Sequence, residues 1–385
     1  MSTNDFYVTP KKIFLDKQPG KVYIFRIFRV LIYVAFLKFI SLYLVKLKKD
    51  DEDKILAMNN PKMRVMVTGA NGFIGLALCK KMLDKGWMVK GVVRSTKYLN
   101  LFPDGIDIVQ IRSVAGDFDW SKALINIDVI VHLAARVHVS RDSISNPLNA
   151  YRHVNVSGTE RLAREAAAAK VRRFIFISSV KVHGKGSYDP YTERDTPGPL
   201  DPYGISKWEA EQALHEIAFD SGMEVVILRP PLVYGPGVKA NFQSLLKVVD
   251  LGIPLPFANV KNRRSLIYIG NLVDVIIVCI NHGKAAGQTY LVSDGDDVAT
   301  PELIRQIAYA FEKPKRLFPF PLILASLMSK FLDRSMSINR ILGSLTVDSS
   351  KIRSELNWRP PYTMSQGLKE TANWYKRKLN NNGIT

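Results

Sequence analysis

Short, almost continuously apolar runs alternate with segments of helical periodicity from Met63 to about residue 230. A run of this kind predicts a strand that is buried on both faces, as in a parallel sheet covered by helices. Strands are expected at 63–70, 87–93, 106–111, 128–135, 172–179 and 223–230, and helices at 76–86, 158–170 and 202–222. This alternation predicts an α/β fold with a doubly wound parallel sheet.

The helix expected at 202–222 has clear start and stop signals. Asp201 can accept a hydrogen bond from the first turn, Pro202 suits the first helical position, and Gly222 can end the helix. Beyond residue 231 the alternation weakens and proline and glycine become more frequent, which predicts a smaller C-terminal lobe. The expected parts are therefore an extension at 1–62, a first domain at 63–230, and a lobe at 231–377 that mainly binds substrate.

The first 62 residues differ from the rest of the chain. VLIYVAFLKFISLYLV (30–45) is apolar apart from Lys38, and basic residues flank it within the stretch 22–49. It is shorter than the roughly 20 residues that span a bilayer, and no small-residue signal-peptide cleavage site follows it. Two interpretations remain: an extension that associates with a membrane surface, or an upstream stretch that the folded domain does not need. The expected location is cytoplasmic, and under the first interpretation it is the inner face of the membrane.

Composition narrows the classes of function. The formal charge of +19 is spread along the chain without a helix-turn-helix, zinc-finger or RNA-binding signature, so no nucleic-acid partner is expected. A small acidic substrate, such as a sugar linked to a diphosphate, also fits a basic protein. Cys79 and Cys279 lie in apolar stretches and are interpreted as core residues in a reducing compartment. The histidines have no metal-ligand spacing, so no metal is expected.

A glycine-rich turn joins the first expected strand to the first expected helix. VTGANGFIG (67–75) places three glycines at intervals of three residues. Glycines allow a tight turn and let the start of the helix approach a pyrophosphate, whose charge suits the helix dipole. The motif therefore predicts a dinucleotide site in a Rossmann-type domain. The expected cofactor contacts in this turn are Gly69, Asn71, Gly72, Phe73, Ile74 and Gly75.

The end of the second expected strand bears on the choice of cofactor. An acidic residue there would accept the ribose 2′-hydroxyl of NAD, whereas an arginine suits the 2′-phosphate of NADP. This chain has Arg94 and no acid at that point, which favours NADP and leaves NAD open. Asp117, after the third strand, is expected to meet the adenine edge.

The stretch DPYGISK (201–207) suggests a proton-transfer pair. Residues four apart share one face of a helix, so Lys207 would lie one turn from Tyr203. A nearby ammonium favours the phenolate and lowers the pKa of a tyrosine. The same spacing occurs at Tyr7–Lys11 and Tyr309–Lys313, so the spacing alone does not identify the pair.

Five motifs in order carry a family resemblance, namely VTGANGFIG (67–75), HLAA (132–135), NVSGT (155–159), ISSVKVHG (177–184) and YGISK (203–207). Together they resemble the extended short-chain dehydrogenase/reductase family, above all its NAD-dependent epimerase/dehydratase branch, over residues 63–377. The resemblance implies that Tyr203 is the acid/base, that Lys207 lowers its pKa and holds the nicotinamide ribose, and that Ser179 hydrogen-bonds the reacting oxygen. It also implies a homodimer and cofactor contacts from Leu133, Ala134, Ala135, Asn155 and Pro230.

The resemblance extends to the substrate side. Arg264 in NRRSLIYIGNLVD (262–274) matches an arginine that holds the diphosphate in sugar-nucleotide members, and a guanidinium suits bidentate phosphate binding. Asn241 matches a second contact to that pyrophosphate. Arg340 is expected to be a further phosphate ligand, and Lys181 a substrate contact. Leu232 stands where epimerases often carry asparagine, which leaves the contacts to the sugar open.

The residues after Ser179 argue against one reaction. Family members that remove water from the sugar carry an Asp-Glu pair there, because elimination needs an acid and a base. This chain has Val180 and Lys181 instead, so a 4,6-dehydratase is not expected.

The expected enzyme is an NAD(P)-dependent 4-epimerase of the UDP-glucose or UDP-GlcNAc type. It would act at C4 of a UDP-hexose or UDP-N-acetylhexosamine in bacterial surface polysaccharide biosynthesis, including lipopolysaccharide O-antigen. The alternative is a 4-keto reductase that forms UDP-N-acetylquinovosamine, and Arg94 favours it. A dehydrogenase of apolar alcohols would not need Arg264, and a non-catalytic dinucleotide-sensing protein would not need to keep Ser179, Tyr203 and Lys207.

Overall fold

The computed structural model describes residues 62–137, 146–186, 189–319 and 343–381. Every helix and strand described below lies within one compact unit, Met63–Thr385. The stretch 22–49, expected to lie on a membrane, falls outside the described residues. Within the described ranges, no helix combines the length and apolar character needed to cross a bilayer.

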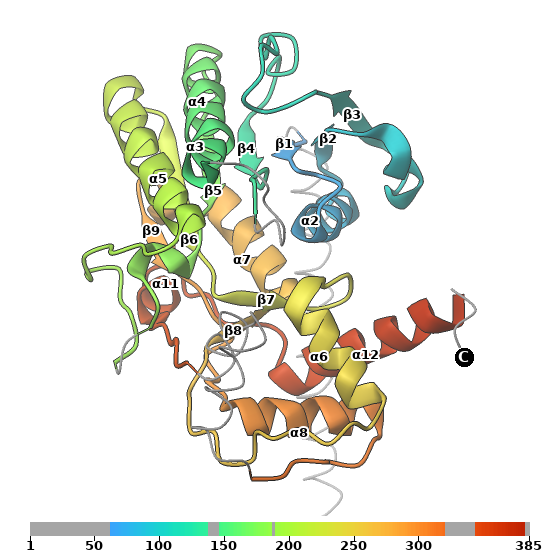
Figure 1. Cartoon of the computed structure of the whole chain (residues 1–385). Coiled ribbons are helices and arrows are strands. Elements are labelled where there is room, and N and C mark those ends of the chain that lie inside the picture. Colours follow the sequence, from blue (N-terminus) through green and yellow to red (C-terminus); the bar gives the residue numbers. More distant parts are fainter. Residues whose placement is uncertain (1–61, 138–145, 187–188, 320–342, 382–385) are drawn as a thin grey trace, which may run out of the picture. The chain divides into compact units, whose positions relative to one another are not determined.

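A parallel sheet of seven strands forms the centre of the described fold, in the order β3-β2-β1-β4-β5-β6-β9 (Figure 1). Its strands are β1 (Arg64–Thr68), β2 (Met88–Val93), β3 (Ile106–Gln110), β4 (Val129–His132), β5 (Arg173–Ile177), β6 (Glu224–Arg229) and β9 (Thr289–Leu291). A second, two-stranded parallel sheet pairs β7 (Leu232–Tyr234) with β8 (Leu266–Tyr268). The order reverses direction between β1 and β4, which is where ligands bind in open parallel sheets of this type.

Helices cover both faces of the large sheet because alternate residues of its strands point to opposite sides. Val65 and Val67 of β1 belong to one apolar core, which also contains Leu78 of α2, whereas Met66 belongs to a second core with Leu162 and Leu214. Figure 1 shows α4 and α5 on one side of the sheet and α2 and α7 on the other. These helices are α2 (Phe73–Asp84), α4 (Gly158–Ala168), α5 (Pro202–Ser221) and α7 (Ile269–Asn281).

The C-terminal part adds further helices to this core. α6 (Ala240–Asp250), α8 (Thr300–Phe311) and α12 (Met364–Asn381) lie together below the sheet in Figure 1. Shorter elements are α3 (Pro147–Arg152), α11 (Ser350–Glu355), the 3₁₀ turns η1 (Thr96–Leu101), η3 (Val180–His183) and η4 (Gly283–Ala285), and the π-helical turn η2 (His153–Ser157).

The predicted α/β class and parallel sheet are confirmed, and the strands predicted up to residue 230 are all present. Asp201 accepts a hydrogen bond from the backbone N–H of Gly204 at 2.8 Å and so begins α5, which ends at Gly222 with φ 74°. One difference concerns the predicted lobe at 231–377. The chain returns to the large sheet there, because β9 pairs with β6 and α7 packs against α2.

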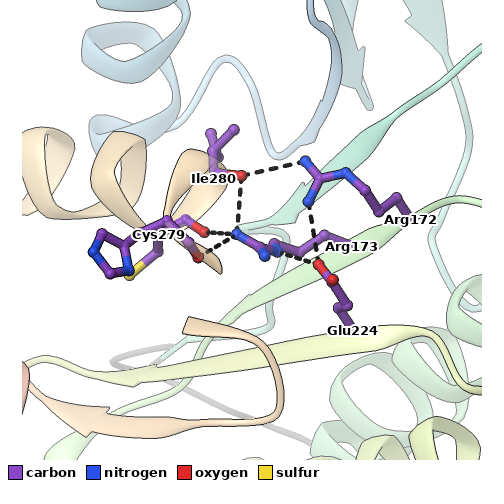
Figure 2. A network of polar contacts seen from close by, with 6 residues as sticks. Arg172, Arg173, Glu224, Cys279 and Ile280 are labelled. Carbon is purple, nitrogen blue, oxygen red and sulfur yellow. Dashed lines mark hydrogen bonds and ion pairs between the residues drawn. The ribbon is translucent and has the colours of Figure 1, made fainter. Parts of the chain in front are cut away.

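Arg173, at the first residue of β5, joins this returning segment to the sheet (Figure 2). Its buried guanidinium donates to the carbonyl groups of Cys279, Ile280 and His282 at the end of α7. Its Nε donates to Glu224 at 2.7 Å, and the more exposed Arg172 also contacts this carboxylate. The last carbonyl groups of a helix lack partners within the helix, and a cation there also opposes the negative end of the helix dipole.

Replacing Arg173 should destabilise the whole fold. In Arg173→Met, the carbonyl groups at the end of α7 and the Glu224 carboxylate lose a buried charged donor, so the free energy of unfolding should fall by about 2–4 kcal/mol. Thermal unfolding followed by circular dichroism measures the change. Arg172→Met is the matched control. Its exposed pair with the same carboxylate should contribute at most about 1 kcal/mol, and the Ile280 carbonyl that it also contacts keeps the hydrogen bond from Arg173. Equal midpoints for the two variants would contradict this role of Arg173.

Candidate active site

The glycine turn after β1 is built as the sequence predicts. Gly69 has φ 68°, and its carbonyl accepts from the backbone N–H of Gly72 at 2.9 Å. A Cβ atom on Gly75 would lie 2.6 Å from the carbonyl oxygen of Ala70, so only glycine fits there. The turn therefore brings the start of α2 close against the end of β1.

The start of α2 suits an anion. Gly72 is the N-cap residue, no side chain caps the helix, and the first turn contains no acidic residue. Backbone N–H groups of a first helical turn lack acceptors within the helix, and the helix dipole is positive there. Phe73 and Ile74 are the first two residues of this helix. These features fit the pyrophosphate of a dinucleotide, which this turn would hold through backbone N–H groups.

The residues after β4 form the neighbouring wall. The backbone N–H of Leu133 donates to the carbonyl of Thr68 at 3.2 Å, and that of Ala134 donates to the Thr68 hydroxyl at 3.2 Å. A Cβ atom on Gly69 would lie 3.0 Å from the backbone nitrogen of Ala134. The structure therefore brings the predicted contacts Leu133 and Ala134 against the glycine turn, and Ala135 follows them in the chain.

Arg94 and Asp117 follow β2 and β3, respectively. Arg94 is exposed and directly follows β2. Asp117 is exposed in the loop after β3, and its carboxylate lies 3.7 Å from the guanidinium of Arg161. Their roles toward the 2′ position and the adenine stay predictions.

Ser179 and Tyr203 meet at the carboxyl end of β5. Ser179 begins the turn η3, Tyr203 lies in the first turn of α5, and a hydrogen bond joins their side chains. The backbone N–H of Val180 donates to the carbonyl of Pro230 at 3.0 Å, so the end of β6 supports the same turn. Serine and tyrosine thus form a polar pair at the carboxyl end of β5, and their catalytic roles stay predictions.

Lys207 lies one turn along α5 and is almost fully buried. Its ammonium donates to the carbonyl of Ile177 at 2.8 Å and lies 4.3 Å from the centroid of the Phe176 ring. Burial lowers its pKa to about 7, and the Glu211 carboxylate opposes this shift. The predicted effect of Lys207 on Tyr203 therefore stays a prediction, since the ammonium contacts β5 in this structure.

The pKa of the Tyr203 phenol is raised above its ordinary value. Burial is the main cause, and the Asp201 carboxylate adds to it, while the hydrogen bond with Ser179 acts in the opposite direction. These surroundings therefore favour the neutral phenol of Tyr203. A phenolate base requires added positive charge at this position.

Lys181 adds a second cation beside Tyr203. Its ammonium lies 2.5 Å from the Asp201 carboxylate and 5.7 Å from the centroid of the Tyr203 ring. Lys181 therefore lies next to the acid/base candidate, and its role as a substrate contact stays a prediction.

A buried hydrogen-bond chain through His132 links Thr68, at the end of β1, to Thr159 of α4. Thr159 donates to the carbonyl of Asn155 at 2.7 Å, so its oxygen must accept from His132 Nε2 at 3.0 Å. His132 Nδ1 is then the acceptor for the Thr68 hydroxyl at 2.7 Å. Burial lowers the pKa of His132 to about 3, which keeps the ring neutral.

The chain continues to α5. The side-chain amide of Asn155 donates to the Ser206 hydroxyl at 3.0 Å, and Ser206 donates to the carbonyl of Tyr203 at 2.8 Å. Asn155 also exchanges hydrogen bonds with the backbone of Arg136 at 2.7 and 3.0 Å. In this structure Asn155, predicted to contact the cofactor, positions the backbone around the site.

The predicted diphosphate ligands lie in the C-terminal part. Asn241 is exposed in the first turn of α6. Arg264 is half-buried, donates to the carbonyl of Gly343 at 2.8 Å, and has a pKa lowered by burial. Arg340 falls outside the described residues. A partly desolvated guanidinium such as that of Arg264 suits the binding of a phosphate group.

Sequence reasoning missed His132, Thr68, Thr159 and Asp201 as contributors to the site. The HLAA motif contains His132 and the NVSGT motif contains Thr159, but nothing in the motifs indicates that these two side chains meet. Within the described ranges, no group of three His, Cys, Asp or Glu residues could hold a metal ion.

Comparisons with known proteins agree with this geometry. A model of the NAD-dependent epimerase/dehydratase family matches residues 65–293. UDP-glucose 4-epimerase of Vibrio cholerae is 45% identical over 312 residues, which cover 80% of this chain and 94% of that protein.

More distant relatives share the same extent. N-acetyl-alpha-D-glucosaminyl-diphospho-ditrans,octacis-undecaprenol 4-epimerase of Escherichia coli O157:H7 is 28% identical, with 80% of this chain and 94% of that protein covered. The crystal structure of UDP-glucuronic acid 4-epimerase from Bacillus cereus in complex with NAD aligns with a TM-score of 0.66 at 24% identity, covering 82% of this chain and 99% of that one. The last likeness concerns the fold alone.

The glycine turn provides a direct test of the dinucleotide site. In Gly75→Ala, the added Cβ would collide with the carbonyl of Ala70, so the start of α2 must move away from the pyrophosphate position. NAD and NADP binding, measured by calorimetry, should weaken at least about tenfold. Gly283→Ala is the matched control, because its Cβ would meet nothing within 4 Å. A folded Gly75→Ala protein that binds both dinucleotides as tightly as the parent would contradict the assignment.

Proposed function

The chain belongs to the NAD-dependent epimerase/dehydratase family, and from this premise we propose that it is an NAD-dependent UDP-glucose 4-epimerase. The main support is the hydrogen-bonded pair of Ser179 and Tyr203 at the carboxyl end of β5, in a chain that is 45% identical to the Vibrio cholerae enzyme. The reaction inverts C4 of the hexose and leaves the redox state of the products unchanged.

Bound NAD would accept and return the hydride at C4, and its oxidised nicotinamide would bring positive charge near Tyr203. The remaining work falls to the chain's own residues. Tyr203 removes the proton from the C4 hydroxyl and later returns it to the C4 oxygen, and Ser179 donates a hydrogen bond to that oxygen. Because burial raises the pKa of Tyr203, the phenol is a competent base only when cations offset the loss of water.

The 4-keto sugar must turn over between the two hydride transfers. This requires a sugar that is held loosely while its diphosphate is held firmly. Arg264, Asn241 and Arg340 are the proposed diphosphate ligands. The half-buried guanidinium of Arg264 suits a phosphate group, and Asn241 is exposed in the first turn of α6. Leu232 is exposed in β7, and its side chain offers no hydrogen bond to the sugar. Its apolar character suits loose binding of the sugar ring.

NAD is the proposed cofactor, in line with the family. Arg94 leaves room for NADP, and it keeps one rival function open: reduction of a UDP-4-keto-6-deoxyhexosamine by NADPH. Four further expectations remain predictions. They are UDP-N-acetylhexosamines as substrates, a role in surface polysaccharide or O-antigen assembly, homodimer formation, and membrane association through residues 22–49.

Two incubations distinguish the epimerase from the reductase. The purified protein with NAD should interconvert UDP-glucose and its C4 epimer with no net change in NADH absorbance. The same protein with a UDP-4-keto-6-deoxyhexosamine and NADPH should leave the NADPH unchanged. Stoichiometric loss of NADPH, with no epimerisation, would favour the reductase and overturn the proposal.

The variant Tyr203→Phe tests the assigned acid/base in the same assay. Removing the phenolic oxygen deletes the proton acceptor, so turnover should fall by at least about 100-fold. NAD binding should persist, because the glycine turn is untouched. Turnover close to that of the parent would show that Tyr203 is not the base.

A further inference from the structure

The geometry points to Lys181 as a positioning residue that controls the ionisation of Tyr203 by neutralising the carboxylate of Asp201. This inference rests on the proposed function only in that Tyr203 is the group whose ionisation matters for catalysis. It differs from the expected role of Lys181 as a direct ligand of the substrate.

The carboxylate of Asp201 contacts both the start of α5 and Lys181. Oδ1 accepts from the backbone N–H of Gly204 at 2.8 Å and thereby caps α5, and Oδ2 lies 2.5 Å from the ammonium of Lys181. The capping contact fixes the carboxylate of Asp201, two residues before Tyr203 in the chain. The negative charge is therefore a permanent neighbour of the phenol, and it acts against the phenolate.

The turn η3 and the start of α5 are held in close contact. A Cβ atom on Gly204 would lie 2.7 Å from the carbonyl oxygen of Lys181, so glycine is required for this approach. The backbone N–H of Lys181 also donates to the Ser179 hydroxyl at 3.3 Å. Lys181 is thus fixed at its backbone by the same turn that presents Ser179 to Tyr203.

The charged and titratable groups around Tyr203 come from several elements. They are Lys181 of η3, the α5 N-cap residue Asp201, Lys207 of α5, Tyr151 of α3, and Arg136 after β4. The guanidinium of Arg136 lies 5.6 Å from the centroid of the Tyr151 ring. Asp201 and Tyr151 raise the pKa of the phenol. The Lys207 ammonium is directed to the carbonyl of Ile177. Lys181 directly contacts the carboxylate of Asp201.

These contacts predict the direction in which each substitution shifts the pKa of Tyr203. Removing the Lys181 charge takes away its compensation of the Asp201 carboxylate, which disfavours the phenolate and raises the pKa of Tyr203. Removing the Asp201 charge has the opposite effect. Removing both charges should bring the pKa back close to its value in the parent. A ligand of the substrate would show none of this coupling in the substrate-free protein.

Fluorotyrosine placed at position 203 of the full chain provides the readout. Its phenol is more acidic than that of tyrosine, and its fluorine resonance reports the ionisation of this one residue without any substrate. In Lys181→Met the midpoint of this titration, with NAD bound, should rise by about one pH unit, the effect of one neighbouring charge after discounting for partial exposure. Lys181→Arg keeps the charge and should titrate like the parent.

Asp201→Asn completes the cycle, since asparagine caps a helix as well as aspartate does and should leave α5 intact. This variant should lower the midpoint, and Lys181→Met combined with Asp201→Asn should restore it to within about 0.3 unit of the parent. An unchanged midpoint in Lys181→Met, or no restoration in the double variant, overturns the inference. Because the titration needs no sugar nucleotide, failure of the proposed epimerase activity is detected separately.

Discussion

The site depends on one constraint, namely that the carboxyl ends of neighbouring parallel strands meet at the same edge of a sheet. β1 leads into the glycine turn, β4 into Ala134, and β5 into Ser179, and the three strands are adjacent in the sheet. The buried chain from Thr68 through His132 to Thr159 then fixes these ends relative to one another. Ser206 extends this control to Tyr203. The cofactor cradle and the acid/base candidate are thus parts of a single hydrogen-bonded framework.

Burial gives this framework its rigidity and also creates an electrostatic problem. It raises the pKa of Tyr203 and lowers that of Lys207 to about 7, so each group is driven toward its neutral form. A proton-transfer site of this kind needs nearby charge to restore its reactivity. The pair of Lys181 and Asp201 lies at the more open end of the site, where its two charges act on the phenol in opposite directions. Tyr203 therefore responds to small changes in the charge around it.

The sequence was sufficient for features that depend on local chemistry. Apolar runs predicted the strands up to β6, and the residues Asp201, Pro202 and Gly222 predicted the limits of α5. It was insufficient where distant segments meet. β9 has only three residues, Thr289–Leu291, and its place beside β6 depends on pairing across the sheet. The contacts of Lys181 with Asp201, and of His132 with Thr68 and Thr159, likewise join residues far apart in the chain, which no local pattern reveals.

The central claim is that Tyr203 exchanges a proton with a C4 hydroxyl while the hydrogen of C4 leaves and returns within one site. UDP-glucose that carries deuterium at C4, incubated with the enzyme and NAD in ordinary water, tests this claim most directly. The account predicts that the epimerised product retains the deuterium at C4, as observed by mass spectrometry and NMR. Loss of the deuterium to water, or its appearance at another carbon, would contradict the account.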